Sequence, residues 1–170
     1  MTLDMFPPTT SSSTAEISPC GLYRYRLTRT WGNAAPLLFV MLNPSTADAS
    51  DDDPTIRRCI GFARREGAGG LVVANLFAFR STDPTALEIA PDPIGPDNAR
   101  WIETCVRETS GPIVAAWGAS VPKRLDLLVH MRIVALLPLD RLRCLGWTAS
   151  GAPRHPLYLP AAATLERWPR

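Results

Sequence analysis

One short stretch of the chain constrains its fold more than any other. Residues 37–42 read LLFVML, an apolar run that stops abruptly at Asn43-Pro44. Six apolar residues closed by turn-forming residues predict a fully buried strand. Such a strand belongs inside a sheet that is covered on both faces. The polar residues after it then lie at the carboxyl end of the strand, where open α/β sheets bind their ligands.

Further apolar runs alternate with segments of helical periodicity. Strands are expected at residues 22–31, 71–77, 113–117 and 142–145, and helices at 55–66, 98–108 and 123–137. Asp53-Pro54 predicts the first helix start, because aspartate caps helices and proline fits their first turn. The tyrosine, leucine and arginine alternation of residues 22–31 is typical of a half-exposed edge strand. The alternation of elements indicates an α/β fold, a three-layer α/β/α sandwich with a central, mainly parallel sheet.

Composition limits the number of domains and the location of the protein. The chain has 170 residues, of which 46% are hydrophobic and 20% charged, as expected for one globular domain. Residues 1–18 are rich in proline, serine and threonine and are predicted to be a flexible leader to a single domain at 19–170. Neither a membrane span nor a secretory signal is recognisable, so we expect a cytoplasmic protein without a membrane partner. The oligomeric state is left open.

Cysteine spacing and net charge say little about ligands. The four cysteines are too far apart to form C-x-x-C pairs, so neither a zinc site nor an iron–sulfur site is expected, and no other cofactor is indicated. The net charge of +2 neither demands nor excludes a nucleic-acid partner.

Three short motifs carry the candidate chemistry. MLNPS places Asn43 directly after the buried strand, VVAN places Asn75 near the end of the next one, and RHP contains His155. A buried asparagine must satisfy its hydrogen-bonding groups or hold them for a ligand. Because the carboxyl ends of parallel strands meet at one sheet edge, these three side chains are expected to share a cleft.

The order and spacing of these motifs resemble the uracil-DNA glycosylase superfamily. MLNPS is similar to its first motif in the asparagine form, VVAN to the second, AAWG at residues 115–118 to the third, and His155-Pro156 to the last. Over about residues 20–160 the chain is also similar to an uncharacterised bacterial and phage domain family with the pattern NPSTAD, DDPTIRR, NLFA and PRHPLY. The first resemblance implies a uracil-DNA glycosylase-like fold. It also implies an enzyme that cleaves the N-glycosidic bond of a modified or deaminated base in DNA, without a metal.

The resemblance also implies roles for the matching residues. Asn43 would position the attacking water, His155 would donate to the base oxygen, and Asn75 would read the base edge. The remaining assignments are Pro44 and Ser45 as one wall of the base pocket, Phe77 (with Phe62 and Phe79 as alternatives) as the stacking ring, and Arg80 and Arg154 as phosphate-binding residues.

The aspartates at positions 48 and 51–53 are not explained by this resemblance. Asp53 is accounted for as a helix cap, and Asp48 or Asp52 could supply the general base that Asn43 cannot be. A solvated acidic loop and a divalent-cation site are alternatives. Three functions therefore stay open: a DNA glycosylase-like hydrolase, a non-catalytic binder of modified bases or nucleic acid, and a hydrolase of free nucleosides or nucleotides.

Overall fold

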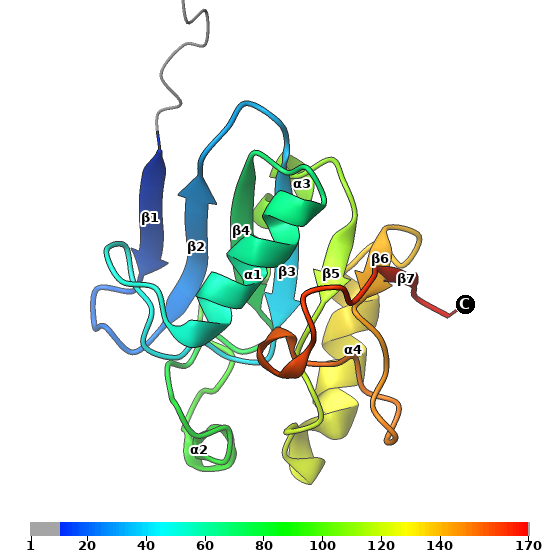
Figure 1. Ribbon diagram of the computed structural model, residues 1–170. Helices are drawn as coiled ribbons and strands as arrows, with labels where there is room; N and C mark the ends of the chain where they lie inside the picture. Colours follow the sequence, from blue (N-terminus) through cyan, green and yellow to red (C-terminus); the bar gives the residue numbers. More distant parts are fainter. Residues whose placement is uncertain (1–10, 170) are drawn as a thin grey trace, which may run out of the picture.

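A computed structural model describes residues 11–169, in which seven strands form one sheet of order β1-β2-β4-β3-β5-β6-β7 (Figure 1). The strands are β1 (Ser12–Ile17), β2 (Arg24–Thr30), β3 (Pro36–Met41), β4 (Gly70–Asn75), β5 (Ile113–Ala115), β6 (Leu142–Cys144) and β7 (Glu166–Arg167). The helices are α1 (Pro54–Arg65), α2 (Ala86–Ile89), α3 (Asn98–Glu108) and α4 (Asp126–Leu136), with the 3-10 turns η1 (Lys123–Leu125) and η2 (Pro156–Tyr158).

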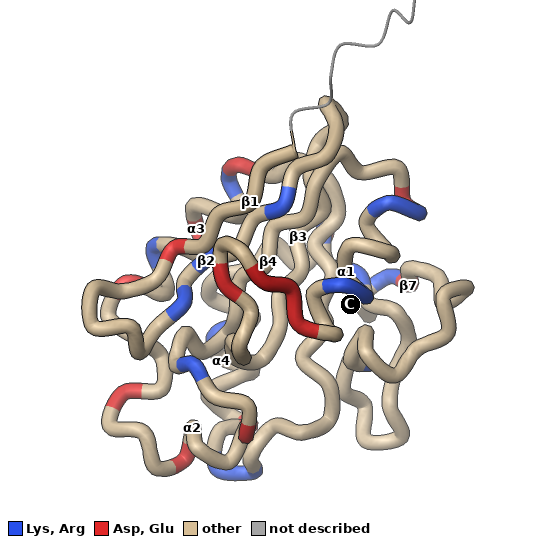
Figure 2. Tube along the Cα trace, turned by 60° about the vertical axis from the view of Figure 1, so that its left-hand side comes forward, with Lys and Arg blue, Asp and Glu red and all other residues tan. Residues whose placement is uncertain are grey.

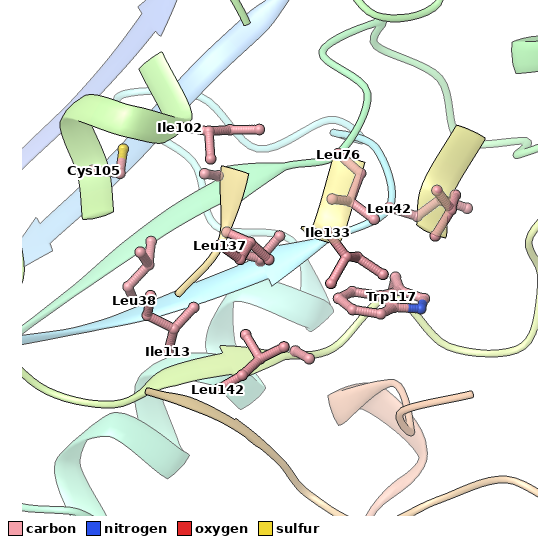
Figure 3. Close-up of a cluster of buried hydrophobic side chains, with 14 of the residues drawn as sticks. Leu38, Leu42, Leu76, Ile102, Cys105, Ile113, Trp117, Ile133, Leu137 and Leu142 are labelled. Carbon is pink, nitrogen blue, oxygen red and sulfur yellow. The ribbon is translucent and has the colours of Figure 1, made fainter. Parts of the chain in front are cut away.

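Helices cover the sheet on both faces, as the alternation predicts. The helix α1 packs on one face through Ile56 and Phe62, and η2 lies beside it (Figure 1). The helices α3 and α4 cover the other face. Figure 3 shows this second core, to which Leu38 of β3, Ile102 of α3 and Ile133 of α4 belong. The α/β class with helices on either side of a central sheet is therefore confirmed.

The sheet is mixed rather than mainly parallel. The strands β4, β3, β5 and β6 are parallel neighbours. The pairs β1–β2, β2–β4 and β6–β7 are antiparallel. Parallel strands need a crossover segment, whereas β1 and β2 are joined by a short turn at Gly21, which has a φ of +76°. Of the six pairings in the described residues, three are therefore parallel and three antiparallel.

Two predictions about the first thirty residues need correction. The sequence places Ser12–Ile17 in a flexible leader, but these residues form β1, which is paired along its length with β2; residues 1–10 lie outside the described residues. The sequence also places residues 22–31 at a sheet edge. In the structure β1 occupies that edge, and β2 lies between β1 and β4. Short polar residues in an edge strand are hard to tell from a leader, because no buried face imposes an apolar pattern.

Two buried arginines of β2 hold the loop that follows β3. Arg29 donates through Nε to Asp52 Oδ1 at 2.8 Å and through Nη2 to the carbonyl oxygen of Asp48 at 2.6 Å. Arg24 donates through Nη1 to the carbonyl oxygen of Ala47 at 2.6 Å. Asp53 caps α1 by accepting from the backbone N–H of Ile56 at 2.8 Å, as predicted. The acidic run, the long red stretch in Figure 2, is thus mainly part of the scaffold.

We expect Arg29→Ala to lower the free energy of unfolding by about 2–3 kcal/mol, because the change leaves the half-buried Asp52 carboxylate and a carbonyl without their donor. Urea unfolding followed by circular dichroism measures this. Arg26→Gln on the same strand is the matched control. Its ion pair with Glu108 is more exposed, so the loss should stay below about 1 kcal/mol. Equal losses for the two variants would contradict the anchoring role of Arg29.

Candidate functional site

A cavity of about 540 Å³ lies at the carboxyl ends of the parallel strands. The chain passes from β3 to β4 on one side and later to β5 on the other, so β3 and β5 flank a topological switch point, where α/β sheets typically bind ligands. The cavity is lined by residues that follow these strands and by the segment around η2. Its polar lining includes Arg24, Asn43, Ser45, Asp53, Asn75, Ser81, Thr82, Ser120, Thr148, Arg154 and His155.

The side chain of Asn43 is held in one orientation at the cavity. Its Nδ2 donates to the carbonyl oxygen of Ser81 at 2.9 Å and lies 3.3 Å from that of Pro44. The backbone N–H of Ser81 donates in return to the carbonyl oxygen of Pro44 at 2.9 Å, which closes this small network. Among the described residues no donor meets Asn43 Oδ1. A fixed amide with a free oxygen can accept a hydrogen bond from a ligand or a water.

Asn75 presents a buried amide that the protein does not satisfy. Its residue is 1% exposed, and within the described residues its Nδ2 has no hydrogen-bond partner. The backbone of Asn75 and Leu76 is fixed by α3, because Asn98 Nδ2 donates to both of their carbonyl oxygens. Burying an unpaired amide costs free energy. Asn75 is therefore a site where a ligand acceptor would restore a missing bond.

The His155 ring is held as a neutral donor. The backbone N–H of Leu157 donates to its Nδ1 at 3.3 Å, which places the proton of the neutral ring on Nε2. Burial lowers the pKa of His155 below its ordinary value, and the charge of Asp53 offsets part of this effect. Gly118 has a φ of +74°, and a Cβ added there would lie 3.0 Å from the Cβ of His155, so the two residues lie close together. The backbone N–H of Gly118 donates to the carbonyl oxygen of Pro153 at 2.9 Å.

Two charged residues of the cavity have a role that the sequence does not predict. Arg24 is 2% exposed, and its desolvation lowers the pKa to about 10, so the side chain stays charged at neutral pH. Asp53 lines the same cavity in addition to capping α1. The sequence does not identify Arg24 as a cavity residue, because the alternation in β2 assigns its arginines to an exposed face. It does not identify Asp53 as one either, because helix capping already accounts for that residue.

The aromatic wall also differs from the prediction. Phe77 is fully buried in the core under α3 and α4, where it packs with Leu87 and Ile102. The aromatic residues of the cavity are Trp117, which follows β5, and Tyr158 of η2, which is 82% exposed at the mouth. Trp117 is the last residue of the strand predicted at 113–117, so the strand-end rule that selected Asn43 would also have selected it.

The other predicted residues divide into two groups. Ser45 and Arg154 line the cavity, and Arg154 Nε donates to the carbonyl oxygen of Trp147 at 3.0 Å. Asp48, Arg80 and Pro44 serve the loops instead. Asp48 Oδ1 accepts from the backbone N–H groups of Ser50 and Asp51, which lowers its pKa. The backbone N–H and the Nη1 of Arg80 donate to the carbonyl oxygens of Leu22 and Gly21.

Residues 11–169 contain neither a cluster of metal ligands nor a membrane-spanning helix. In this part of the chain no three histidine, cysteine, aspartate or glutamate side chains gather closely enough to hold a metal ion together. None of the helices in the same residues has the length and apolar character that a membrane span requires.

Comparison with known proteins gives one match. A family model described as a protein of unknown function, DUF1643, matches residues 24–157. This range contains the sheet from β2 to β6 and the cavity residues from Arg24 to Leu157. No curated protein and no solved structure matches the chain.

Gly118→Ala is expected to destabilise the fold by about 1–2 kcal/mol, because an L-residue is strained at positive φ and the new Cβ would lie 3.0 Å from the Cβ of His155. Thermal and urea unfolding measure the change. Gly61→Ala, in the exposed middle of α1 with nothing within 4 Å of the added Cβ, is the control and should stabilise by about 0.5–1 kcal/mol. A neutral Gly118→Ala would mean that the loop adapts freely.

The lowered pKa of His155 predicts a pH effect on stability. Below the ordinary pKa of 6.5 the unfolded chain binds a proton at this ring while the folded chain resists it, so the free energy of unfolding falls as the pH falls. The wild type should lose stability relative to His155→Gln between about pH 7 and pH 5. Urea unfolding across this range tests the effect, with His130→Gln at an exposed position as the control. Parallel curves for wild type and His155→Gln would refute it.

Proposed function

We propose that this chain, which belongs to DUF1643, a family of unknown function, hydrolyses the N-glycosidic bond of a modified or deaminated base in DNA. The proposal is based on the residues that line the cavity. One observation carries this proposal. Asn43, Asn75 and His155, which come from distant parts of the chain, line one cavity, and each carries a hydrogen-bonding atom that no described residue satisfies. The cavity volume of about 540 Å³ is within the usual range for small-ligand sites.

The reaction needs three kinds of group. The bond between C1′ of the sugar and the base nitrogen breaks, the oxygen of a water bonds to C1′, and the two water protons end on the new sugar hydroxyl and on the released base. The sugar gains positive character and the base negative character in the transition state. The site therefore needs an acceptor that orients the water, a group that takes a proton, and a donor to the base.

The cavity offers one residue for each of these roles. Asn43 Oδ1 would orient the water, because its Nδ2 is already held by the Ser81 carbonyl. Asp53 would take the water proton, a role that the sequence offers to Asp48 or Asp52, because Asp53 is the carboxylate that lines the cavity. His155 would donate through Nε2 to a base oxygen as negative charge develops there.

Base recognition would rest on Asn75 and the aromatic wall. The free Nδ2 of Asn75 suits a carbonyl oxygen on the base edge, and an amide offers both a donor and an acceptor. Trp117 and Tyr158 would contact the faces of an extruded base and its neighbours, because aromatic rings stack on bases of any sequence. Arg154 at the rim would hold a backbone phosphate.

The motif order that resembles the uracil-DNA glycosylase superfamily supports this proposal, and two differences limit it. Ser45 stands at a cavity-lining position where many members carry glycine, so a base would approach this backbone less closely. Leu157-Tyr158 follows His155-Pro156 in place of the usual residues. These differences concern which base is accepted rather than the presence of water-orienting and donor groups.

A second candidate function is hydrolysis of free nucleotides. It is favoured by the charge distribution, because the 18 basic and 16 acidic residues nearly balance and Figure 2 shows both signs scattered along the chain. Proteins that track DNA usually gather basic residues on one face.

The test is base release from oligonucleotides carrying uracil or modified pyrimidines, single- or double-stranded, followed by alkaline cleavage. We expect strand breaks with wild type and Arg26→Gln, and a loss of about 100- to 1000-fold for His155→Ala, since one transition-state donor is removed. Asn43→Ala should lose activity similarly. Absence of breaks across the panel would overturn the proposal, and base release from free nucleotides alone would support the second candidate. Tight binding without turnover, lost in Asn75→Ala, would indicate a binding protein.

A further inference from the structure

Two arginines on one strand differ in how their charge is compensated. Arg24 and Arg29 are both buried in β2 and both reach the loop after β3. Arg29 forms an ion pair with Asp52 at 2.8 Å. Arg24 donates one side-chain hydrogen bond, to the Ala47 carbonyl, and its Nε has no partner among the described residues. Arg24, unlike Arg29, lines the cavity.

An arginine in this protein can have its donors satisfied without a carboxylate, as the half-buried Arg141 shows. Arg141 donates from all three of its nitrogens to the carbonyl oxygens of Val106, Thr109 and Gly111. The chain therefore has the means to neutralise the donors of a structural arginine with backbone oxygens. At Arg24 it supplies only one such oxygen, although an unpaired buried charge is costly.

The Arg24 guanidinium forms no ion pair inside the cavity either. In residues 11–169 the ion pairs are formed by Arg26, Arg29, Arg65 and Arg100, so no carboxylate lies within pairing distance of Arg24. Asp53 lines the same cavity, but its Oδ1 accepts the capping bond from Ile56. The Nδ2 of Asn75 adds a second buried donor without an acceptor. Arg24 and Asn75 thus each bring to the cavity lining a buried donor that has no acceptor among the described residues.

We propose that Arg24 is an anion-binding residue of this cavity, so that the ligand carries a carboxylate or a phosphate whose oxygens dock on the guanidinium. The planar guanidinium presents paired donors that match such groups. This inference rests on the proposed function, which supplies the nucleobase part of the ligand. It adds that the ligand also carries an anionic group. Two sources supply this chemistry: a carboxylate on the base itself, and the phosphate of a free nucleotide.

Matched probes that cannot be hydrolysed at an N-glycosidic bond separate the two sources. Uracil and 5-carboxyuracil form the first pair, and the C-nucleoside pseudouridine and its 5′-monophosphate form the second. Isothermal titration calorimetry with the full chain gives the dissociation constants. We expect the anionic member of one pair to bind about 10- to 100-fold more tightly than its neutral partner, because a hydrogen-bonded charge pair is involved.

The preference for the anion should depend on Arg24. Arg24→Gln should abolish it, Arg24→Lys should keep part of it, and Arg26→Gln should leave it unchanged. Because Arg24→Gln also loses the bond to the Ala47 carbonyl, urea unfolding is measured for each variant to show that it is folded. If Arg24→Gln does not fold, the reduced anion preference expected of Arg24→Lys is the test. No anion preference in either pair for the wild type, or a full preference in Arg24→Gln, would overturn the inference.

The inference and the proposed function can fail separately. Base release from oligonucleotides together with equal binding of neutral and anionic probes would leave the function standing and remove the inference. An Arg24-dependent preference for the anion without base release from any oligonucleotide or nucleotide would keep the inference and remove the hydrolase.

Discussion

The position of β3 between β4 and β5 is the constraint on which the rest of the structure depends. The strand is hydrogen-bonded on both edges and covered by helices on both faces, so every side chain in it except that of Pro36 is buried. The chain that leaves β3 therefore enters a loop at the carboxyl edge of the sheet. Because β4 and β5 end at the same edge, the residues after all three strands meet there. The cavity is a direct result of this arrangement.

The loop after β3 is held in place by the strand β2. Arg24 and Arg29 reach beneath it and bind its carbonyl oxygens, and Arg29 also holds Asp52. This anchoring explains how a loop of small and acidic residues can present fixed groups to a cavity. It also explains the acidic run, where Asp52 pairs with an arginine and Asp53 caps α1. Among the aspartates of this loop, Asp53 is the one that combines a scaffold role with a place in the cavity.

Local chemistry allowed the central elements to be predicted. The buried strands, the start of α1 at Asp53-Pro54 and the span of α3 agree with the sequence, because burial and capping act on neighbouring residues. Asn43, Asn75 and His155 could be expected to converge, since strand ends in a parallel sheet share an edge. Phe77 could not be placed, because its environment depends on the packing of α3 and α4. The strand β1 has too little buried surface to impose a pattern.

The sequence by itself determined the α/β class, the alternation of strands and helices, and the residue types that could meet at one edge. These depend on periodicity and on turn chemistry, which are local. The tertiary structure decided which charges face the cavity. It directed Arg29 to Asp52 and left Arg24 without a carboxylate, and it gave Asp53 rather than Asp48 a place in the lining. Two arginines of one strand look alike in sequence, and only the position of the loop across them separates a structural residue from one that is free to bind a ligand.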